Sequence, residues 1–365
     1  MDLQLPAQDA SKIDTGGCKS QRKWRHLPCI YTTIASPMSS KAEPLPASAP
    51  PTRLTITDRD AWKKALATRR PIVVHLNADT TWLVQLPRPA SDGRRSTFNL
   101  LIDPWLQGPQ SDVASWFSTQ WHVVAPSVHT LAALEQLLRE VDPNSESSAT
   151  EDGAYIDAVA ISHEFTDHCH RATLEELPRS TPVIATDKAA NLIRSWKHFD
   201  TVVTTPGFPG PDSAVPDLPS WLSIGRVVSP GNALYYHSAI VIVFDSDTAP
   251  NSSKREAIVY SPHGIKPADL KSIQKSGVPT LALLHGLHDV RIWMSKQLNL
   301  GGRNAAEAVR AAGARYWIAT HDEVKKGGGF ISLLLRRTVH PPPPKEEGAG
   351  YKFVELGSGD GVVLE

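Results

Sequence analysis

The stretch AYIDAVAISHEFTDH (154–168) joins a short apolar run to a cluster of metal-binding side chains. Its first half has the length and the apolar residues of a buried β-strand. His163, Asp167 and His168 follow within six residues, and such groups are costly to bury without a metal ion or dense hydrogen bonding. Phe165 stands where a fuller metal site would have another histidine. The stretch therefore predicts a metal site at the end of a strand, and Phe165 indicates that this site lacks one histidine ligand.

Upstream of this stretch, three β-rich runs predict an antiparallel meander, with turns at Asp79 and at the PASDGRR segment. The runs are PIVVHLN (71–77), TTWLVQLP (80–87) and FNLLID (98–103). A helix is expected over 127–141, because its leucines recur on one helical face.

Downstream, strands alternate with helices, and a second β-rich section is followed by a further strand–helix–strand unit. Strands are expected at 181–186, 200–205, 223–229, 233–244, 256–261, 280–286 and 314–320, and helices at 172–177, 187–196 and 304–312. Two β-rich blocks, each followed by strand–helix units, predict an α/β protein in which two mixed sheets lie face to face with helices outside.

Composition divides the chain into three parts. Residues 1–52 are rich in Ser, Pro and Ala without periodic apolar positions, so we expect a disordered tail. Residues 53–340 form the predicted folded domain, and a Pro-rich extension is expected over 341–365.

Charge and cysteine content exclude several classes of protein. Lys+Arg and Asp+Glu both total 38, which argues against a nucleic-acid partner held by a basic field. Three cysteines are too few for a disulfide framework in 365 residues. No apolar run approaches the roughly 20 residues that span a bilayer. We therefore expect a cytoplasmic protein with no membrane partner, and no pattern indicates an oligomeric state.

Histidines that follow apolar runs are the candidate metal ligands. They are His163, His237, His263, His285 and His321, and Asp167 and His168 complete the set. Zinc is usually held by four ligands drawn from His, Asp, Glu and Cys. Five other histidines are interpreted as hydrogen-bonded residues at element boundaries: His75, His122, His129, His198 and His340.

The string SHEFTDH (162–168) resembles the H-x-H-x-D-H signature of the metallo-β-lactamase fold hydrolases. The resemblance extends to TTWLVQLP and NLLIDPW with an aspartate turn at Asp103, and to the closing segment from TLALLHG to ARYWIATHDE. The order of elements is similar to the branch that contains ascorbate-phosphate lactonases and related phosphodiesterases. The resemblance covers about residues 54 to 335 and implies a four-layer αββα sandwich.

The resemblance also implies a role for each ligand at two metal positions. At the first position, His163 matches the first ligand, Phe165 replaces the second, and His237 is the candidate for the third. At the second position, Asp167 and His168 match the aspartate–histidine pair, and His321 matches the last histidine. His263 stands where the family has a bridging aspartate.

This ligand count favours one metal ion, zinc, over two, although manganese or iron would accept the same ligands. Asp167 is either a ligand or a catalytic base toward the metal-activated water. The segment HGLHDVRIW (285–293) supplies His285, His288 and Arg291 to bind a substrate phosphate or carboxylate, unless it is a polar surface loop.

The first hypothesis is therefore a metal-dependent hydrolase that acts on a small-molecule ester, lactone, thioester or phosphodiester. The alternative is a catalytically inactive relative that serves as a binding or scaffold protein. Phe165 and His263 favour the alternative, whereas Asp167, His168 and His321 favour the enzyme.

Overall fold

The computed structural model describes residues 50–89, 95–112, 114–142, 154–208, 215–229, 231, 237–246, 254–293, 296–343 and 350–365. The chain divides into two units, Met1–Ser48 and Ala49–Glu365, and everything described here belongs to the second. The predicted disordered tail therefore lies outside the described residues up to residue 49.

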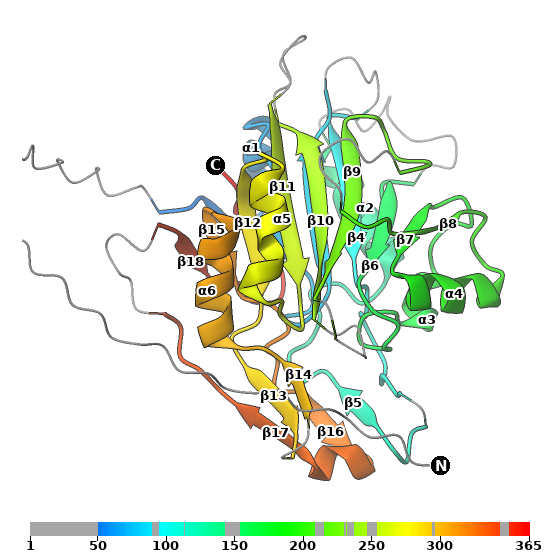
Figure 1. Ribbon diagram of the computed structural model, residues 1–365. Coiled ribbons are helices and arrows are strands. Elements are labelled where there is room, and N and C mark those ends of the chain that lie inside the picture. Colours follow the sequence, from blue (N-terminus) through cyan, green and yellow to red (C-terminus); the bar gives the residue numbers. More distant parts are fainter. Residues whose placement is uncertain are drawn as a thin grey trace, which may run out of the picture. The chain divides into compact units, whose positions relative to one another are not determined.

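The first sheet has eight strands in the order β1-β19-β2-β3-β4-β6-β7-β8. Its β4, β6, β7 and β8 strands are labelled in Figure 1. The strands are β1 (Arg53–Thr55), β2 (Ile72–His75), β3 (Trp82–Pro87), β4 (Thr97–Ile102), β6 (Ala158–Ile161), β7 (Val183–Ala185), β8 (Val202–Thr204) and β19 (Asp360–Val363). The antiparallel meander expected over 71–103 is confirmed by the pairing of β2, β3 and β4. From β4 to β8 the neighbours are parallel, as strand–helix units require.

The second sheet has six strands in the order β18-β15-β12-β11-β10-β9. They are β9 (Leu222–Val228), β10 (Ser238–Asp245), β11 (Arg255–Ser261), β12 (Thr280–His285), β15 (Tyr316–Ile318) and β18 (Lys352–Val354). The β9, β10 and β11 strands pair antiparallel, whereas β11, β12, β15 and β18 are parallel. This sheet is therefore mixed, like the first.

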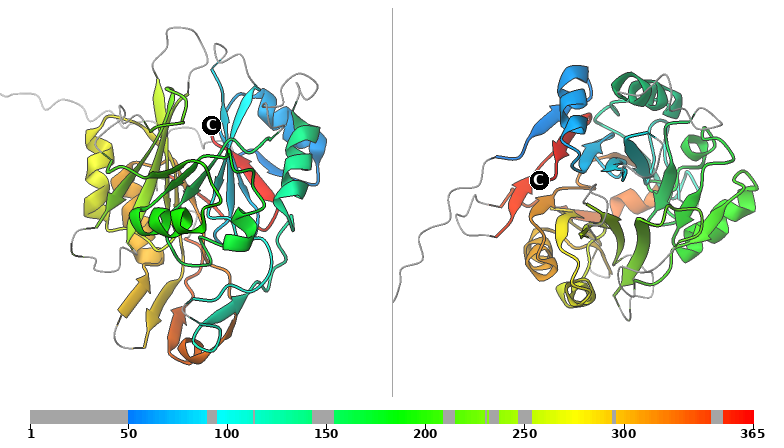
Figure 2. Two further views of the ribbon diagram at one scale, coloured as in Figure 1. Left: turned by 90° about the vertical axis from the view of Figure 1, so that its right-hand side faces the viewer. Right: turned by 90° about the horizontal axis from the view of Figure 1, so that it is seen from above.

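Three apolar layers show that the unit is the predicted four-layer αββα sandwich. The central layer packs the inner faces of both sheets together, for example Val84 against side chains such as Ile242. The alternate residues of the same strands, such as Leu83 and Val243, face outward into separate layers beneath the helices. Figure 2 shows the helices outside both sheets.

The helices cover the outer faces as their apolar spacing predicts. The first sheet carries α1 (Arg59–Ala67), α2 (Leu131–Val141), α3 (Arg171–Leu174) and α4 (Asp187–Trp196), and the second carries α5 (Lys271–Lys275) and α6 (Gly302–Ala312). The α2 helix begins later than the predicted residue 127, because Thr130 is its N-cap and accepts the amide of Ala133. No helix in the described part of the chain is long and apolar enough to cross a bilayer.

The end of the chain corrects the predicted extension over 341–365. Its β18 strand pairs with β15, and its β19 strand lies between β1 and β2. Val362 and Leu364 are buried in the layer between the sheets. The polyproline run marks an interruption in regular structure rather than the end of the folded unit, because apolar residues after it complete both sheets.

Two small sheets lie together beyond one end of the sandwich, at the bottom of Figure 1. One contains β13 (Asp289–Ile292), β14 (Lys296–Asn299) and β17 (Leu335–Thr338). The other pairs β5 (Thr119–Trp121) with β16 (Lys326–Gly328), and the 3-10 turn Phe330–Leu333 follows β16. The glycine-rich segment KKGGG (325–329) thus contributes a short strand to this part of the molecule.

Candidate metal centre

The candidate ligands follow the ends of strands from both sheets. His163 and His168 come after β6, His263 comes after β11, and His321 comes after β15. They fall into two buried groups, His163 with His168 and His263, and Asp167 with His168 and His321. In each group the ligand atoms lie within 4.8 Å of one another. His168 belongs to both groups, so it is the centre of the site.

Two imidazole nitrogens approach especially closely. The Nε2 atoms of His168 and His263 are 3.0 Å apart, which is also a hydrogen-bond distance when one of the two nitrogens carries a proton. Two nitrogens bound to one zinc at 2.0–2.1 Å, in tetrahedral geometry, would be about 3.3 Å apart. These two side chains therefore already stand near the separation that a shared ion requires.

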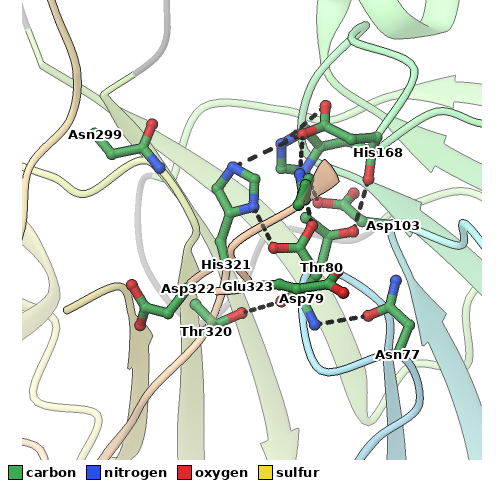
Figure 3. Close-up of polar contacts among 12 residues, drawn as sticks. Asn77, Asp79, Thr80, Asp103, His168, Asn299, Thr320, His321, Asp322 and Glu323 are labelled. Atoms are coloured by element: carbon green, nitrogen blue, oxygen red, sulfur yellow. Dashed lines mark hydrogen bonds and ion pairs between the residues drawn. The ribbon is translucent and has the colours of Figure 1, made fainter. Parts of the chain in front are cut away.

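Buried carboxylates orient two of the histidines (Figure 3). The Nδ1 atom of His168 donates to Asp103 at 2.7 Å, and that of His321 donates to Asp79 at 3.0 Å. Each bond selects the tautomer that carries its proton on Nδ1 and directs Nε2 toward the centre. Carboxylate partners of this kind also raise the basicity of a metal-binding imidazole.

Neutral partners orient the other two histidines. His263 Nδ1 donates to the side-chain oxygen of Asn299 at 2.9 Å, and His163 Nδ1 donates to the Ser162 hydroxyl at 3.0 Å. Burial and the neighbouring histidines hold the pKa of His263 well below its ordinary value. Its imidazole is therefore neutral at pH 7, as a metal ligand must be.

Asp103 is the anchor beneath His168. Its carboxylate also accepts the backbone amide of Ser162 at 2.7 Å, the Ser162 hydroxyl, and the Tyr260 hydroxyl at 2.9 Å. Burial alone would lower the pKa of His168, but the adjacent Asp167 and Asp103 carboxylates raise it overall. Asp103 thus stabilises positive charge on His168, whether the charge comes from a proton or from a metal ion.

Two residues of the site have left-handed backbone conformations. The φ angle is 45° at Asp103 and 58° at His321, and neither residue is glycine. Such conformations are uncommon for other residues and concentrate at functional sites. The backbone amide of His321 donates to the Asp79 carbonyl at 2.8 Å, which holds this turn in place.

Lys325 is the functional candidate that sequence reasoning missed. Its ammonium lies 2.7 Å from Asp79 Oδ2 and 2.8 Å from Asp167 Oδ2, and its side chain is only 5% exposed. It also lies 5.2 Å from the centre of the Trp105 ring. The sequence offered one signal, a lysine four residues after His321. The three glycines that follow shortly after it are typical of a surface turn, so the lysine was not counted as a site residue.

The opposite charges of Lys325 and the two carboxylates stabilise one another's ionised forms. Burial alone would lower the pKa of Lys325, but Asp167 and Asp79 raise it overall. Burial alone would raise the pKa of Asp167, but Lys325, His168 and His321 lower it overall, well below its ordinary value. The ammonium and the carboxylate are therefore both ionised across the range in which proteins work.

The two residues after His321 tie the site to its surroundings. The Glu323 carboxylate accepts His122 Nδ1 at 2.6 Å and the amides of Val123 and Val124. The Asp322 carboxylate accepts two backbone amides of the loop that follows β12, and burial raises its pKa to about 7.

His237 is absent from both ligand groups among the described residues. Its Nδ1 atom donates to the backbone carbonyl of His263 at 3.1 Å, so it supports the chain at His263. Sequence order alone made it a ligand candidate, because a histidine that begins a strand can face either side of it.

The three predicted substrate residues are likewise outside both ligand groups within the described ranges. His285 is fully buried and donates to the Gly286 carbonyl at 2.9 Å. His288 lies 3.0 Å from an Arg337 nitrogen, and Arg291 is an exposed β13 residue that donates to Gln297 at 3.1 Å. Their role in substrate binding stays a prediction.

The donor set fits a transition metal. It offers buried imidazole nitrogens and one carboxylate, which are the ligands that zinc takes in catalytic sites. Burial lowers the pKa of His321 despite the nearby Asp79, so this imidazole is also neutral. Manganese and iron accept the same donors, and the donors alone do not select among the three.

Comparison with known proteins finds likeness in structure alone. No protein-family model and no curated protein matches the chain. An isothiocyanate hydrolase from Delia radicum gut bacteria is similar at 17% identity and TM-score 0.48, over 80% of this chain and 97% of that one.

Two further solved structures are similar over most of the chain. The metallo hydrolase Igni18 from Ignicoccus hospitalis KIN4/I has 13% identity and TM-score 0.44, over 81% of this chain and 98% of its own. The metallo-β-lactamase fold protein YhfI from Bacillus subtilis has 14% identity and TM-score 0.41, over 79% and 98%. All the TM-scores quoted lie below 0.5, so what this chain does has to be inferred from its own residues.

Proposed function

We propose that this protein is a metal-dependent hydrolase with one zinc ion, acting on a small ester, lactone, thioester or phosphodiester. The observation that carries the proposal is the 3.0 Å approach of His168 Nε2 to His263 Nε2 among buried, oriented imidazoles. An ion held by His168 and His263 would draw further ligands from His321 and Asp167, with His163 beside them.

A bound ion would supply a water molecule with a pKa lowered toward about 7 and would polarise the substrate oxygen. The protein residues hold the geometry for this chemistry. Asp103, Asn299 and Asp79 fix the tautomers of the imidazoles, and burial excludes bulk water from them.

Asp167 is better suited to be a ligand than a catalytic base. Its Oδ2 atom accepts Lys325, and its Oδ1 atom lies 3.7 Å from His168 Nε2. A carboxylate whose pKa is held well below its ordinary value is a weak proton acceptor at neutral pH. We therefore assign Asp167 to the metal through Oδ1.

The alternative is an inactive binding or scaffold protein, which would be purified without a bound metal ion, whereas the proposed hydrolase would contain one. The cytoplasmic location, the small-molecule substrate and the lack of nucleic-acid and membrane partners stay predictions. None of them enters the argument for the site.

Metal content of the purified protein tests the proposal. Protein expressed with zinc available should contain about one equivalent, because a structural or catalytic zinc site of this kind binds tightly. His168→Ala should lose the ion, whereas His129→Ala, at an exposed position, should keep it.

Hydrolysis of p-nitrophenyl acetate, a lactone and bis(p-nitrophenyl) phosphate by the zinc-loaded wild type completes the test. Wild-type protein with less than about a tenth of an equivalent of any transition metal would contradict the proposal. Retention of the ion by His168→Ala would contradict the assigned ligands.

A further inference from the structure

We infer that Lys325 takes the place of a second metal ion, and so limits this site to one. The inference rests on the proposed function, because it concerns the same metal centre. Lys325 bridges two buried carboxylates, Asp79 and Asp167, at 2.7 Å and 2.8 Å. Both carboxylates also contact His321, through Asp79 Oδ1 at 3.0 Å and Asp167 Oδ2 at 3.8 Å.

The charges around the histidines balance with one dication. Asp79, Asp103 and Asp167 are the carboxylates in contact with the ligand histidines, and together they carry three negative charges. Lys325 contributes one positive charge and a divalent ion contributes two, so the sum is zero. A second dication would leave two uncompensated positive charges in a buried site, which is costly.

The histidines by themselves also suffice for one ion only. The two groups of ligand atoms share His168, and a neutral imidazole offers one lone pair. An ion at His163 would have to take His263 from the other ion. The Phe165 ring lies near both of these imidazoles, with ring centres 6.2 Å and 6.4 Å away, and offers no donor atom.

Lys325 occupies a place between two carboxylates that a further cation would otherwise find free. Its ammonium already donates to Asp167 Oδ2 and forms an ion pair with Asp79 Oδ2, and a metal ion would need the same oxygen atoms at about 2.0–2.2 Å. The ammonium compensates the negative charge of the two carboxylates, as a metal ion would, but it does not need coordinating ligands around it. A purely structural ion pair would have the same contacts but would not control metal binding.

The test is the zinc stoichiometry of wild-type protein, Lys325→Met and Lys326→Met after saturation and removal of loosely bound metal. Methionine keeps most of the volume of the side chain and removes its charge. Lys326, the next residue, is exposed and starts β16, so its variant is the matched control.

We expect about one equivalent in wild type and Lys326→Met, and about two in Lys325→Met, because the vacated place leaves two carboxylates to bind a cation. In titrations, the second ion should bind to Lys325→Met at least about tenfold more tightly than to wild type.

Each other outcome overturns the inference. Two ions in wild type, or a single ion in Lys325→Met, would show that Lys325 does not limit the site. Two ions in Phe165→His with Lys325 intact would do the same. An ion count near zero in wild type would instead reject the proposed function itself, and with it this inference. If Lys325→Met yields no folded protein, the zinc stoichiometry of Lys325→Gln is compared with that of wild type in its place, with the same expected result.

Discussion

Replacing Asp103 by asparagine tests whether the orientation of His168 sets metal affinity. Asp103 accepts His168 Nδ1 at 2.7 Å, the Ser162 amide at 2.7 Å and the Tyr260 hydroxyl at 2.9 Å. Asparagine has a nearly identical shape but only one accepting oxygen. At least one donor would therefore face the new NH2 group, and the electrostatic support for His168 would be lost.

The magnitude follows from these contacts. Loss of a carboxylate partner of a ligand histidine typically weakens metal binding by about 10–100-fold, which corresponds to about 1.4–2.7 kcal/mol. A buried donor left without an acceptor costs a further 1–3 kcal/mol, roughly, of folding free energy. We expect the zinc-loaded variant to fold but to bind zinc at least about tenfold more weakly.

The assay is competition with a chromophoric chelator, with urea unfolding of the same samples to separate affinity from stability. Asp157→Asn is the matched control. The side chain of Asp157 is also buried, accepts the Asn99 amide at 2.7 Å and pairs with Arg88 and Arg95, but Asp157 precedes β6, at the opposite end from His163. It should lose stability and keep zinc affinity. Zinc affinity of Asp103→Asn within about twofold of wild type would refute the reasoning.

Three further predictions concern the rest of the molecule. Chelation of the metal should lower the melting temperature and zinc should restore it, since ligands that bind only the folded state stabilise it; an unchanged melting temperature would speak against a bound ion. Burial lowers the pKa of His285 to about 4 from an ordinary value of 6.5. Between these two pH values the unfolded chain binds a proton at His285 and the folded protein does not. The free energy of unfolding therefore falls by about 1.4 kcal/mol for each pH unit as the pH is lowered through this range. Urea unfolding of wild type and His285→Gln from pH 7 to 4.5 should show a shallower loss in the variant, and equal slopes would contradict this origin. Leu364→Ala should cost about 2–5 kcal/mol of unfolding free energy, because Leu364 is fully buried between the sheets. The control Val339→Ala, at a position that is 62% exposed, should stay within about 0.5 kcal/mol of wild type. A loss as small for Leu364→Ala would mean that the end of the chain is not part of the core.

The layered architecture could be predicted because its signals are local. The meander up to residue 103 and the α4 helix, which matches its predicted range of 187–196, follow from apolar periodicity that each segment carries by itself. The end of the chain was predicted wrongly for the complementary reason. The β19 strand is defined by its pairing with β1 and β2, more than 280 residues earlier, and not by a pattern of its own.

At the candidate metal centre, too, some residues could be predicted from local sequence and others could not. His163, Asp167, His168, His263 and His321 were predicted from their places after strands, and all five belong to the two ligand groups. Position next to a strand also selected His237, which precedes β10, and His285, which ends β12, because such a position does not specify which way a side chain points. Their side chains instead contact backbone carbonyls at 3.1 Å and 2.9 Å.

The sequence by itself determined the α/β layering and the histidines at the strand ends, since both arise from periodicity and position along single segments. Only the tertiary structure decided which charges meet. Asp79 and His321 are 242 residues apart in sequence, and Lys325 and Asp167 are 158 apart. The free energy of a buried charge depends on the partner that the fold places beside it, and no local pattern records that partner. Lys325 therefore resembles a surface lysine in the sequence, whereas in the folded protein it is the cation between two carboxylates of the candidate metal centre.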